Sequence, residues 1–180
     1  MGLVGAMASD FRFFRESCDG RADVALMSYG LYPVLLYRIG HRAQRLPWVL
    51  RMPVLFLYHL CRIMTELAFG VSLARTAEIG VPLMIHHHGQ IFVAAGCRIG
   101  ARCQIYHGVT IGERGGRQAG RPTIGDDVIV GAGAKILGPV HVGNRARVGA
   151  NAVVVDNVPP GSTVVGIPAR PVQRKPEAIS

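Results

Sequence analysis

A six-residue repeat in the second half of the chain is the feature that most restricts its fold. From residue 124 onward every sixth position is aliphatic, and the residue four places after each is small or β-branched: Ile124, Val130, Ile136, Val142, Val148 and Val154 begin the repeats. A helix repeats about every 3.6 residues and a strand every two, so neither explains this pattern. A parallel β-helix does, because each short strand turns one aliphatic side chain inward before a tight corner.

The same rhythm continues upstream, through Ile79, Ile85 and Ile91 and then Val93, Ile99, Ile105 and Ile111. Three faces of this kind make a coil of about 18 residues in the left-handed, triangular form that such repeats build. Tight corners require unusual backbone angles, which fits a content of 23 glycines. The predicted fold is therefore mainly β, a left-handed parallel β-helix over residues 71–172. A small helical region precedes it at 1–70, and a tail follows at 173–180.

The rhythm is broken at two places. Between Ile91 and Val93 it slips by two residues, and between Ile111 and Ile124 the interval is 13 residues. The second break contains a stretch rich in glycine and arginine, residues 112–122, which we expect to leave the coil as a loop. Long loops on a rigid solenoid usually have a binding role.

The two breaks, taken as corner insertions, allow the coils to be stacked on paper. One face then stacks Ile85, Ile105, Val130 and Val148, and two residues further along the column reads His87, His107, Ala132 and Ala150. Strands in neighbouring coils lie about 4.8 Å apart. The sequence therefore predicts that His87 and His107 are vertical neighbours above two small side chains.

Residues 1–70 carry apolar side chains at helical spacing, and we expect two or three helices over residues 11–15, 28–45 and 46–69. The last of these is apolar over most of its surface. It could cover the open end of the solenoid, contact another subunit, or dock on a membrane surface through nearby arginines, namely Arg38, Arg42, Arg45 and Arg51.

Composition narrows the setting in which the chain works. Hydrophobic residues are 49% and charged residues 17%, which excludes a disordered chain. The net charge of +9 is compatible with anionic partners such as a nucleic acid, a membrane surface or a phosphorylated cofactor. We expect no nucleic-acid partner. The apolar stretch 46–60 is shorter than the ~20 residues that a spanning helix needs. The four cysteines have no metal-type spacing, so we expect reduced core residues and a cytoplasmic protein, with peripheral attachment to the inner face of the membrane as an alternative.

Three segments together resemble the hexapeptide-repeat acyltransferases, in particular their serine acetyltransferase branch. They are GVTIG at 108–112, IGDDVIVGAGAKILGPVHVG at 124–143 and VGANAVVVDNVPPGSTVVGIPAR at 148–170. The resemblance implies a left-handed β-helix, a homotrimer or a dimer of trimers with active sites between subunits, acetyl-CoA as the donor, and acyl transfer to a hydroxyl. The short N-terminal region suggests that the nearest members are the short polysaccharide-type O-acetyltransferases.

Acyl transfer to an alcohol needs a base for the hydroxyl proton, and imidazole suits this role near neutral pH. The segment MIHHHGQI at 84–91 resembles the family's catalytic segment and implies that His87 is the general base. A solvent-facing turn and a metal site remain alternatives for a run of three histidines. Glu113, at the entrance of the loop, is a candidate for orienting His87.

The resemblance also implies binding roles for other residues. On the donor side they are Gly112, Ala132, Arg147 and Ala150, with the alanines leaving room for the pantetheine arm and Arg147 facing phosphates. On the acceptor side they are His86, His107 and Arg121. Two aspartates of the serine-specific enzymes are replaced here by His86 and Ser72, and the loop's Arg-His pair is reduced to Arg121 followed by Pro122.

Carboxylates are the natural partners of the ammonium group of serine. Their replacement favours a sugar hydroxyl, as in exopolysaccharide units or their precursors, with serine as the alternative acceptor. A zinc hydro-lyase of the carbonic anhydrase kind is a minor alternative, with His87, His107 and either His88 or His141 as ligands. A non-catalytic scaffold is another. No metal is expected in the leading interpretation.

Overall fold

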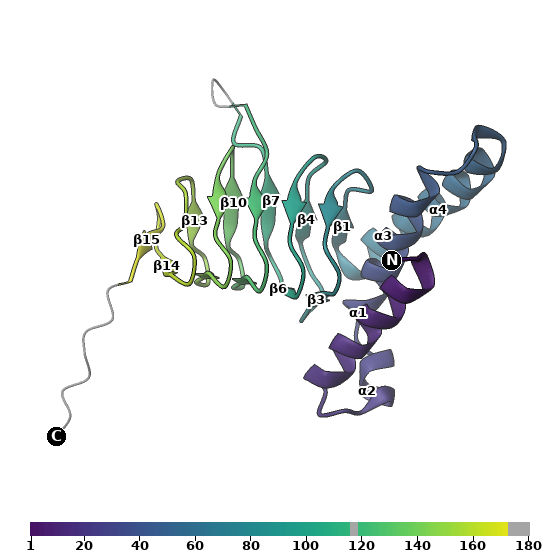
Figure 1. The fold of residues 1–180 in the computed structure, drawn as a ribbon, viewed down its shortest axis with the longest axis horizontal. Coiled ribbons are helices and arrows are strands. Elements are labelled where there is room, and N and C mark those ends of the chain that lie inside the picture. Colours follow the sequence, from purple (N-terminus) through teal and green to yellow (C-terminus); the bar gives the residue numbers. More distant parts are fainter. Residues whose placement is uncertain (116–118, 173–180) are drawn as a thin grey trace.

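The structure, a computed structural model, describes residues 1–115 and 119–172. Figure 1 shows a solenoid of stacked coils with a group of helices at one end. The helices lie within residues 3–69 and the strands within residues 71–171, with Gly70 between them. Residues 116–118 of the expected loop and the expected tail at 173–180 lie outside the described residues.

The solenoid has three sheets, one for each face of the coil. The first contains β1 (Val71–Leu73), β4 (Ile91–Val93), β7 (Thr110–Gly112), β10 (Lys135–Leu137) and β13 (Val153–Val154). The second contains β2 (Glu78–Ile79), β5 (Arg98–Ile99), β8 (Thr123–Ile124) and β11 (His141–Val142). The third contains β3 (Leu83–Ile85), β6 (Cys103–Ile105), β9 (Ile129–Val130), β12 (Arg147–Val148), β14 (Thr163–Val165) and β15 (Arg170–Pro171). Only the β14–β15 pair is antiparallel among the described strands, so the predicted left-handed parallel β-helix is confirmed.

The inward column of the third sheet has the predicted register. Ile85 pairs with Ile105, Ile105 with Val130, and Val130 with Val148. All four side chains are buried in one continuous core. Burial of an aliphatic side chain contributes about 1.5–3 kcal/mol. The aliphatic positions of the six-residue repeat therefore form this core.

The first break lies elsewhere than the sequence rhythm suggested. Residues 91–93 form the continuous strand β4, so no slip occurs within them. Ile85 pairs with Ile105 and Val93 with Ile111, which makes the upper segment eight residues long and the lower one six. The two extra residues therefore enlarge the corner at 86–90, which carries the three histidines.

The second break is the expected loop. Ile111 pairs with Ile136, 25 residues later, whereas Ile136 pairs with Val154, 18 residues later. The seven additional residues lie between β7 and β8, where Figure 1 shows the described residues 113–115 and 119–122 leaving and rejoining the solenoid.

Four helices precede the solenoid, where two or three were expected. They are α1 (Leu3–Ser17), α2 (Ala22–Leu26), α3 (Leu31–Ala43) and α4 (Trp48–Phe69). The first starts well before residue 11, because residues 3–10 continue its helical spacing. It ends where Asp19 and Gly20 adopt positive φ angles of 52° and 78°, and a short helix then forms before α3.

The open end of the solenoid is capped mainly by α3 together with α1, while α4 contributes only its C-terminal end, where Phe69 packs against the core. Val34 and Tyr37 of α3 belong to the same buried cluster as the strand residues. The Tyr37 hydroxyl donates to the carbonyl of Ala77 at 2.7 Å and accepts from the amide of Ile79 at 3.1 Å. Burial raises the pKa of Tyr37 to about 12.

A buried ion pair fastens this cap. Arg38 Nε and Asp10 Oδ2 lie 2.9 Å apart, and their side chains are 6% and 0% exposed. Arg38 also donates to the carbonyls of Ile79 and Gly80 at 2.6 and 2.7 Å, while Asp10 accepts from the amide of Leu83 at 2.9 Å. The expectation that Arg38 could meet a membrane is therefore wrong, because its guanidinium is committed to the interior.

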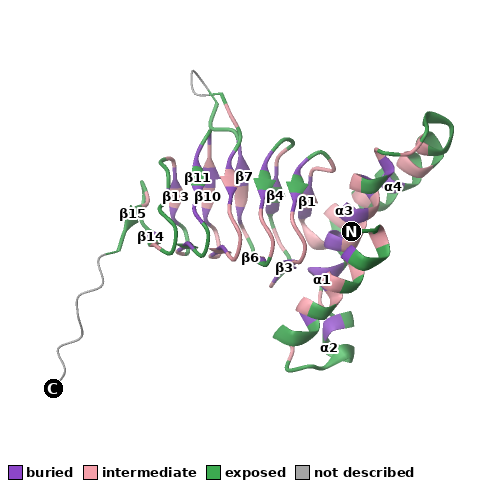
Figure 2. Cartoon of the chain, viewed as in Figure 1, coloured by how far each residue is buried: buried purple, intermediate pink, exposed green. Residues whose placement is uncertain are grey.

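Helix α4 packs on α3 but remains largely exposed, as Figure 2 shows. A Cβ atom on Gly40 of α3 would lie 2.2 Å from the ring of Tyr58, so glycine permits this close crossing. Neither Pro47, at the N-cap, nor Pro53 ends the helix, which runs for 22 residues. By length and mean hydropathy, 1.3 over its most apolar window, α4 could cross a membrane. The expectation that this segment is too short is corrected by its extension to Phe69.

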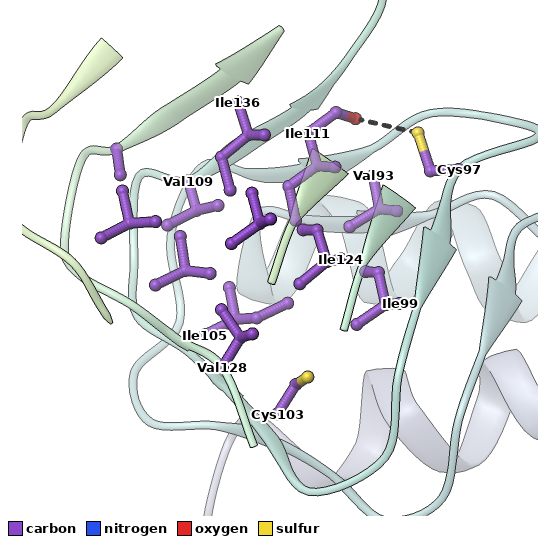
Figure 3. Packing of buried hydrophobic residues seen from close by; sticks show 14 of the residues in the cluster. Val93, Cys97, Ile99, Cys103, Ile105, Val109, Ile111, Ile124, Val128 and Ile136 are labelled. Atoms are coloured by element: carbon purple, nitrogen blue, oxygen red, sulfur yellow. Dashed lines mark hydrogen bonds between the residues drawn. The ribbon is translucent and has the colours of Figure 1, made fainter. Parts of the chain in front are cut away.

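The cysteines are all free, but they do not share one environment. Cys97 and Cys103 lie in the core of the solenoid, where Figure 3 shows them among the stacked aliphatic side chains. Burial raises the pKa of both thiols, that of Cys103 to about 11. Cys18 is only partly buried and Cys61 is exposed on α4, so the expectation of four core cysteines is wrong for these two.

Candidate active site

Two histidine rings meet at the enlarged corner, as the stacking predicted. The centroids of His87 and His107 are 5.7 Å apart, and the rings are inclined by 65°, edge to face. Backbone bonds hold the stacked corners in this register: Gly108 donates to the carbonyl of Gly89, and Gly133 donates to the carbonyl of His107, both at 2.8 Å. The pair therefore lies on a rigid backbone ladder although both imidazoles are exposed in the single chain.

Glycine is required where these corners stack. Gly108 and Gly133 have φ angles of 71° and 73°, in the left-handed region that side chains disfavour. A Cβ atom on Gly108 would also lie 3.2 Å from the Cα of Gly133. The corner containing His107 therefore sits directly on the corner below it.

His86 has a different environment from its neighbour. Its ring stacks on Tyr106 at a centroid distance of 4.3 Å and an angle of 15°. Its Nε2 lies 2.7 Å from Gln104 Oε1, a bond in which the ring N–H donates and the amide oxygen accepts. Tyr106 and Gln104 were not identified from the sequence, although their position in the His107 segment, one coil below His86, could have indicated them. His86 thus supplies a fixed aromatic surface beside His87.

His88 turns toward the helices. Its ring meets that of Tyr29 edge to face at 4.7 Å, and Tyr29 in turn lies 5.9 Å from the ring of Phe69. This contact links the enlarged corner to the N-terminal region. It also directs His88 away from the imidazole pair.

At His86 and Ser72, the two positions where the serine-specific enzymes have aspartate, no carboxylate is bound to the histidines of the described chain. Ser72 Oγ donates to Glu66 Oε1 at 2.6 Å, and Glu66 is also paired with Arg62 at 3.0 Å. Among the ion pairs of the described residues, none joins a histidine to a carboxylate. Sequence reasoning did not identify Glu66, although it lies only six residues before Ser72, on the other side of Gly70.

Glu113 and Arg121 bind each other at the base of the loop. Arg121 also donates to the carbonyl of Ala95 at 2.9 Å, in the corner that follows β4. The histidine pair lies in the corners that precede β4 and β7. Within a single chain, the structure therefore does not bring Arg121 or Glu113 beside His87, and Glu113 is engaged with a cation.

The expected donor-side residues are divided between two places. Ala132 and Ala150 continue the column below His107, and the amide of Asn151 donates to the carbonyl of Ala132 at 2.8 Å. Arg147 lies on the outer face of the third sheet, exposed and beside a surface hollow lined also by Ser162 and Thr163. Gly112 is buried at the end of β7, where a Cβ atom would lie 3.2 Å from that of Ala94. The alanine column and Arg147 thus share a face, and Gly112 does not.

The side chains do not form the metal site of the hydro-lyase alternative. No group of three potential metal ligands occurs among residues 1–115 and 119–172. His88 contacts Tyr29, and His141 lies on β11 of the second sheet. The arrangement at the corner therefore favours acid–base chemistry by a histidine pair.

Comparisons with known proteins agree with the fold. Residues 121–156 match the family described as bacterial transferase hexapeptide (six repeats), and residues 93–114 match the hexapeptide repeat of succinyl-transferase. The serine acetyltransferase of Mycobacterium tuberculosis is 38% identical over 93% of this chain and 72% of its own length. That of Helicobacter pylori strain J99 is 36% identical over 84% of this chain and 86% of its own length.

Solved structures give the same result. The crystal structure of Neisseria gonorrhoeae serine acetyltransferase superposes with a TM-score of 0.79 at 34% identity, over 98% of this chain and 68% of that one. A serine acetyltransferase in complex with CoA superposes with a TM-score of 0.79 at 30% identity, over 94% and 69% of the two chains. The expected closeness to polysaccharide-type enzymes has no support here, since the relatives are serine acetyltransferases. The chain belongs to the hexapeptide-repeat acyltransferase family and is an acyltransferase whose homologues are serine acetyltransferases.

Proposed function

We propose that this protein transfers an acetyl group from acetyl-CoA to the hydroxyl of serine, with His87 as the general base. The paired rings of His87 and His107 on stacked corners are the observation that carries the proposal. Acetyl-CoA is the co-substrate, and the complex of a homologue with CoA supports this donor. Serine is the first choice of acceptor because relatives of 36–38% identity are serine acetyltransferases.

The chemistry needs one base and one site for a developing negative charge. The acceptor oxygen attacks the thioester carbonyl carbon while His87 takes the hydroxyl proton, and the carbonyl oxygen becomes an oxyanion. Collapse of this intermediate breaks the carbon–sulfur bond and releases the thiolate of CoA. The imidazolium of His87 then returns its proton to that sulfur, so the enzyme is unchanged.

The surroundings of the pair suit the donor. Ala132 and Ala150 leave the wall below His107 free of large side chains, where a thioester arm would have room. Arg147 projects from the same face and forms no ion pair or side-chain hydrogen bond among the described residues, so its guanidinium is available to a phosphate. A single chain leaves both histidines open to water. We infer that a second copy closes the site, in the homotrimer or pair of trimers that the family resemblance implies. Four free cysteines favour the cytoplasm as the place where it acts.

A sugar hydroxyl is the second candidate acceptor, and one observation favours it. The groups in contact with His86 are the ring of Tyr106 and the amide of Gln104, both uncharged. An ammonium group would find no carboxylate bound to these histidines within the described residues. A neutral polyol needs no carboxylate partner to bind here. A flat aromatic surface also suits the apolar face of a sugar.

The deciding experiment measures release of the CoA thiol from acetyl-CoA with a panel of acceptors. Turnover with free serine, and none with sugars or glycans, would support the first proposal. The opposite result would establish the sugar candidate. Without thiol release by any acceptor, and with no acetyl-CoA binding in calorimetry, the acetyl-transfer proposal itself would be wrong.

A further inference from the structure

In an ordinary soluble protein a surface helix turns its apolar side inward and its charged side to solvent, and helix α4 does the reverse. Its charged residues, Arg51, Arg62 and Glu66, are half-buried and not exposed. Glu66 is held there by Arg62 at 3.0 Å and by Ser72 of β1 at 2.6 Å. The exposed side carries no acidic residue and no arginine, and its one titratable ring is that of His59.

The side that faces away from the protein is apolar along the length of the helix except at His59. Its large side chains are between 48% and 77% exposed, and they are Trp48, Val49, Leu50, Met52, Phe56, Leu57, Leu60, Ile63, Met64 and Leu67. We call this set the α4 face. An apolar patch of this extent marks a surface that another apolar phase covers.

The charged residues near the α4 face indicate which kind of apolar partner covers it. Between residues 31 and 69 the only acidic residue is Glu66, and it is already paired, whereas the same segment holds five arginines. Arg42 and Arg45, at the end of α3 from which the chain enters α4, are exposed and form no ion pair among the described residues. A second copy that packed through its own α4 would offer these arginines no free carboxylate, because Glu66 is already paired. A bilayer with anionic headgroups offers them many.

We propose that the α4 face binds the surface of an anionic lipid bilayer, with Arg42 and Arg45 at the phosphate level. The helix is about 33 Å long at 1.5 Å per residue. It lies in the interface and does not cross it, because its other side is packed on α3 at Gly40 and bound to β1 through Glu66. Trp48, at the start of the helix, belongs to the residue type that prefers the headgroup region. The inference is independent of which acceptor the enzyme uses.

The single tryptophan gives a direct test without any variant. Trp48 is the only tryptophan of the chain and is 71% exposed. Vesicles of phosphatidylglycerol and phosphatidylcholine should shift its emission to the blue, and lipids brominated on the acyl chain should quench it. Vesicles of phosphatidylcholine alone should bind more weakly, and high salt should reduce binding to the anionic vesicles.

Two pairs of variants separate the apolar and the electrostatic contributions in vesicle sedimentation. Phe56→Gln with Leu60→Gln should weaken binding by about tenfold for each side chain. Ile167→Gln, which alters an equally exposed residue at the far end of the solenoid, should have no effect. Arg42→Gln with Arg45→Gln should weaken binding to anionic vesicles by about fivefold per arginine. Arg98→Gln, on the second sheet, is the matched control.

Other occupants of the α4 face would give distinct results. If a second copy covers it, Trp48 emission is already blue-shifted without lipid, vesicles leave it unchanged, and Phe56→Gln with Leu60→Gln reduces the oligomer in light scattering. If Trp48 emission is that of an exposed ring and no vesicle changes it, the α4 face does not bind a lipid bilayer. Either result overturns the proposal. Retained circular dichroism of the variants would show that loss of binding is not loss of fold.

Discussion

His107 lies one coil below His87, and the two rings meet edge to face with 5.7 Å between their centroids. The two residues are 20 positions apart in the sequence, and the enlarged corner at 86–90 brings them together. Neither imidazole is bound to a carboxylate among the described residues, so the rings are free to receive a proton from an acceptor. This relationship gives the first prediction.

Replacing His87 with Ala should reduce kcat by about 10²–10⁴-fold, because a positioned general base contributes that much to proton transfer. His107→Ala should act mainly on the KM of the acceptor. His141→Ala, which removes an exposed histidine on the second sheet, should leave both constants unchanged. Steady-state thiol release measures all three, and a fully active His87→Ala enzyme would remove this residue from the mechanism.

Filling the alanine column should impair use of the donor. Ala132→Leu or Ala150→Leu places a large side chain where we propose that the arm of CoA lies, so the KM for acetyl-CoA should rise by an order of magnitude or more while the fold is kept. Ala101→Leu, in a corner between the second and third sheets, serves as the control. Unchanged acetyl-CoA binding in the column variants, measured by calorimetry, would place the donor elsewhere.

The buried pair of Arg38 and Asp10 should dominate the stability of the helical cap. Asp10→Ala leaves the guanidinium buried without its partner, and loss of one member of such a pair costs about 3–5 kcal/mol. Asp156→Ala breaks an exposed pair with Arg170 and should change the free energy of unfolding very little. Denaturant titration followed by circular dichroism compares the two. Equal stability of both variants would mean that the cap contributes little to the folded state.

The four thiols should react at different rates with a disulfide reagent. Cys61 is exposed and should react first, followed by Cys18. Cys103, whose pKa is raised to about 11 by burial, holds almost no thiolate at neutral pH, and Cys97 is shifted in the same direction. Both should react only on unfolding. Mass spectrometry of the labelled peptides assigns the order, and rapid labelling of Cys103 in the folded protein would contradict its core position.

The period of six was sufficient to predict the solenoid and the stacking of His87 on His107. Inward aliphatic residues recur at a fixed interval because every coil uses the same three corners, so the register can be counted along the chain. The loop after β7 could be located in the same way. The enlarged corner could only be located to within a few residues, because a slip in the period does not show on which side of a strand the extra residues lie.

The helices have no fixed repeat from which their packing could be counted along the chain, so only the tertiary structure decided their roles. Their spacing predicted helices but not which one covers the solenoid. Helix α4, for which capping was one of three alternatives, lies largely in the open, while α3 forms the cap through Tyr37 and Arg38. Arg38 looked like its neighbours Arg42 and Arg45 in the sequence, yet it is buried because Asp10, 28 residues earlier, meets it in space. Repeat folds are built from contacts at regular sequence separations, whereas the cap, the Arg38–Asp10 pair and the exposed face of α4 depend on how whole elements dock. That is why the sequence by itself determined the coil and its histidine column, and why the surroundings of that column had to be read from the fold.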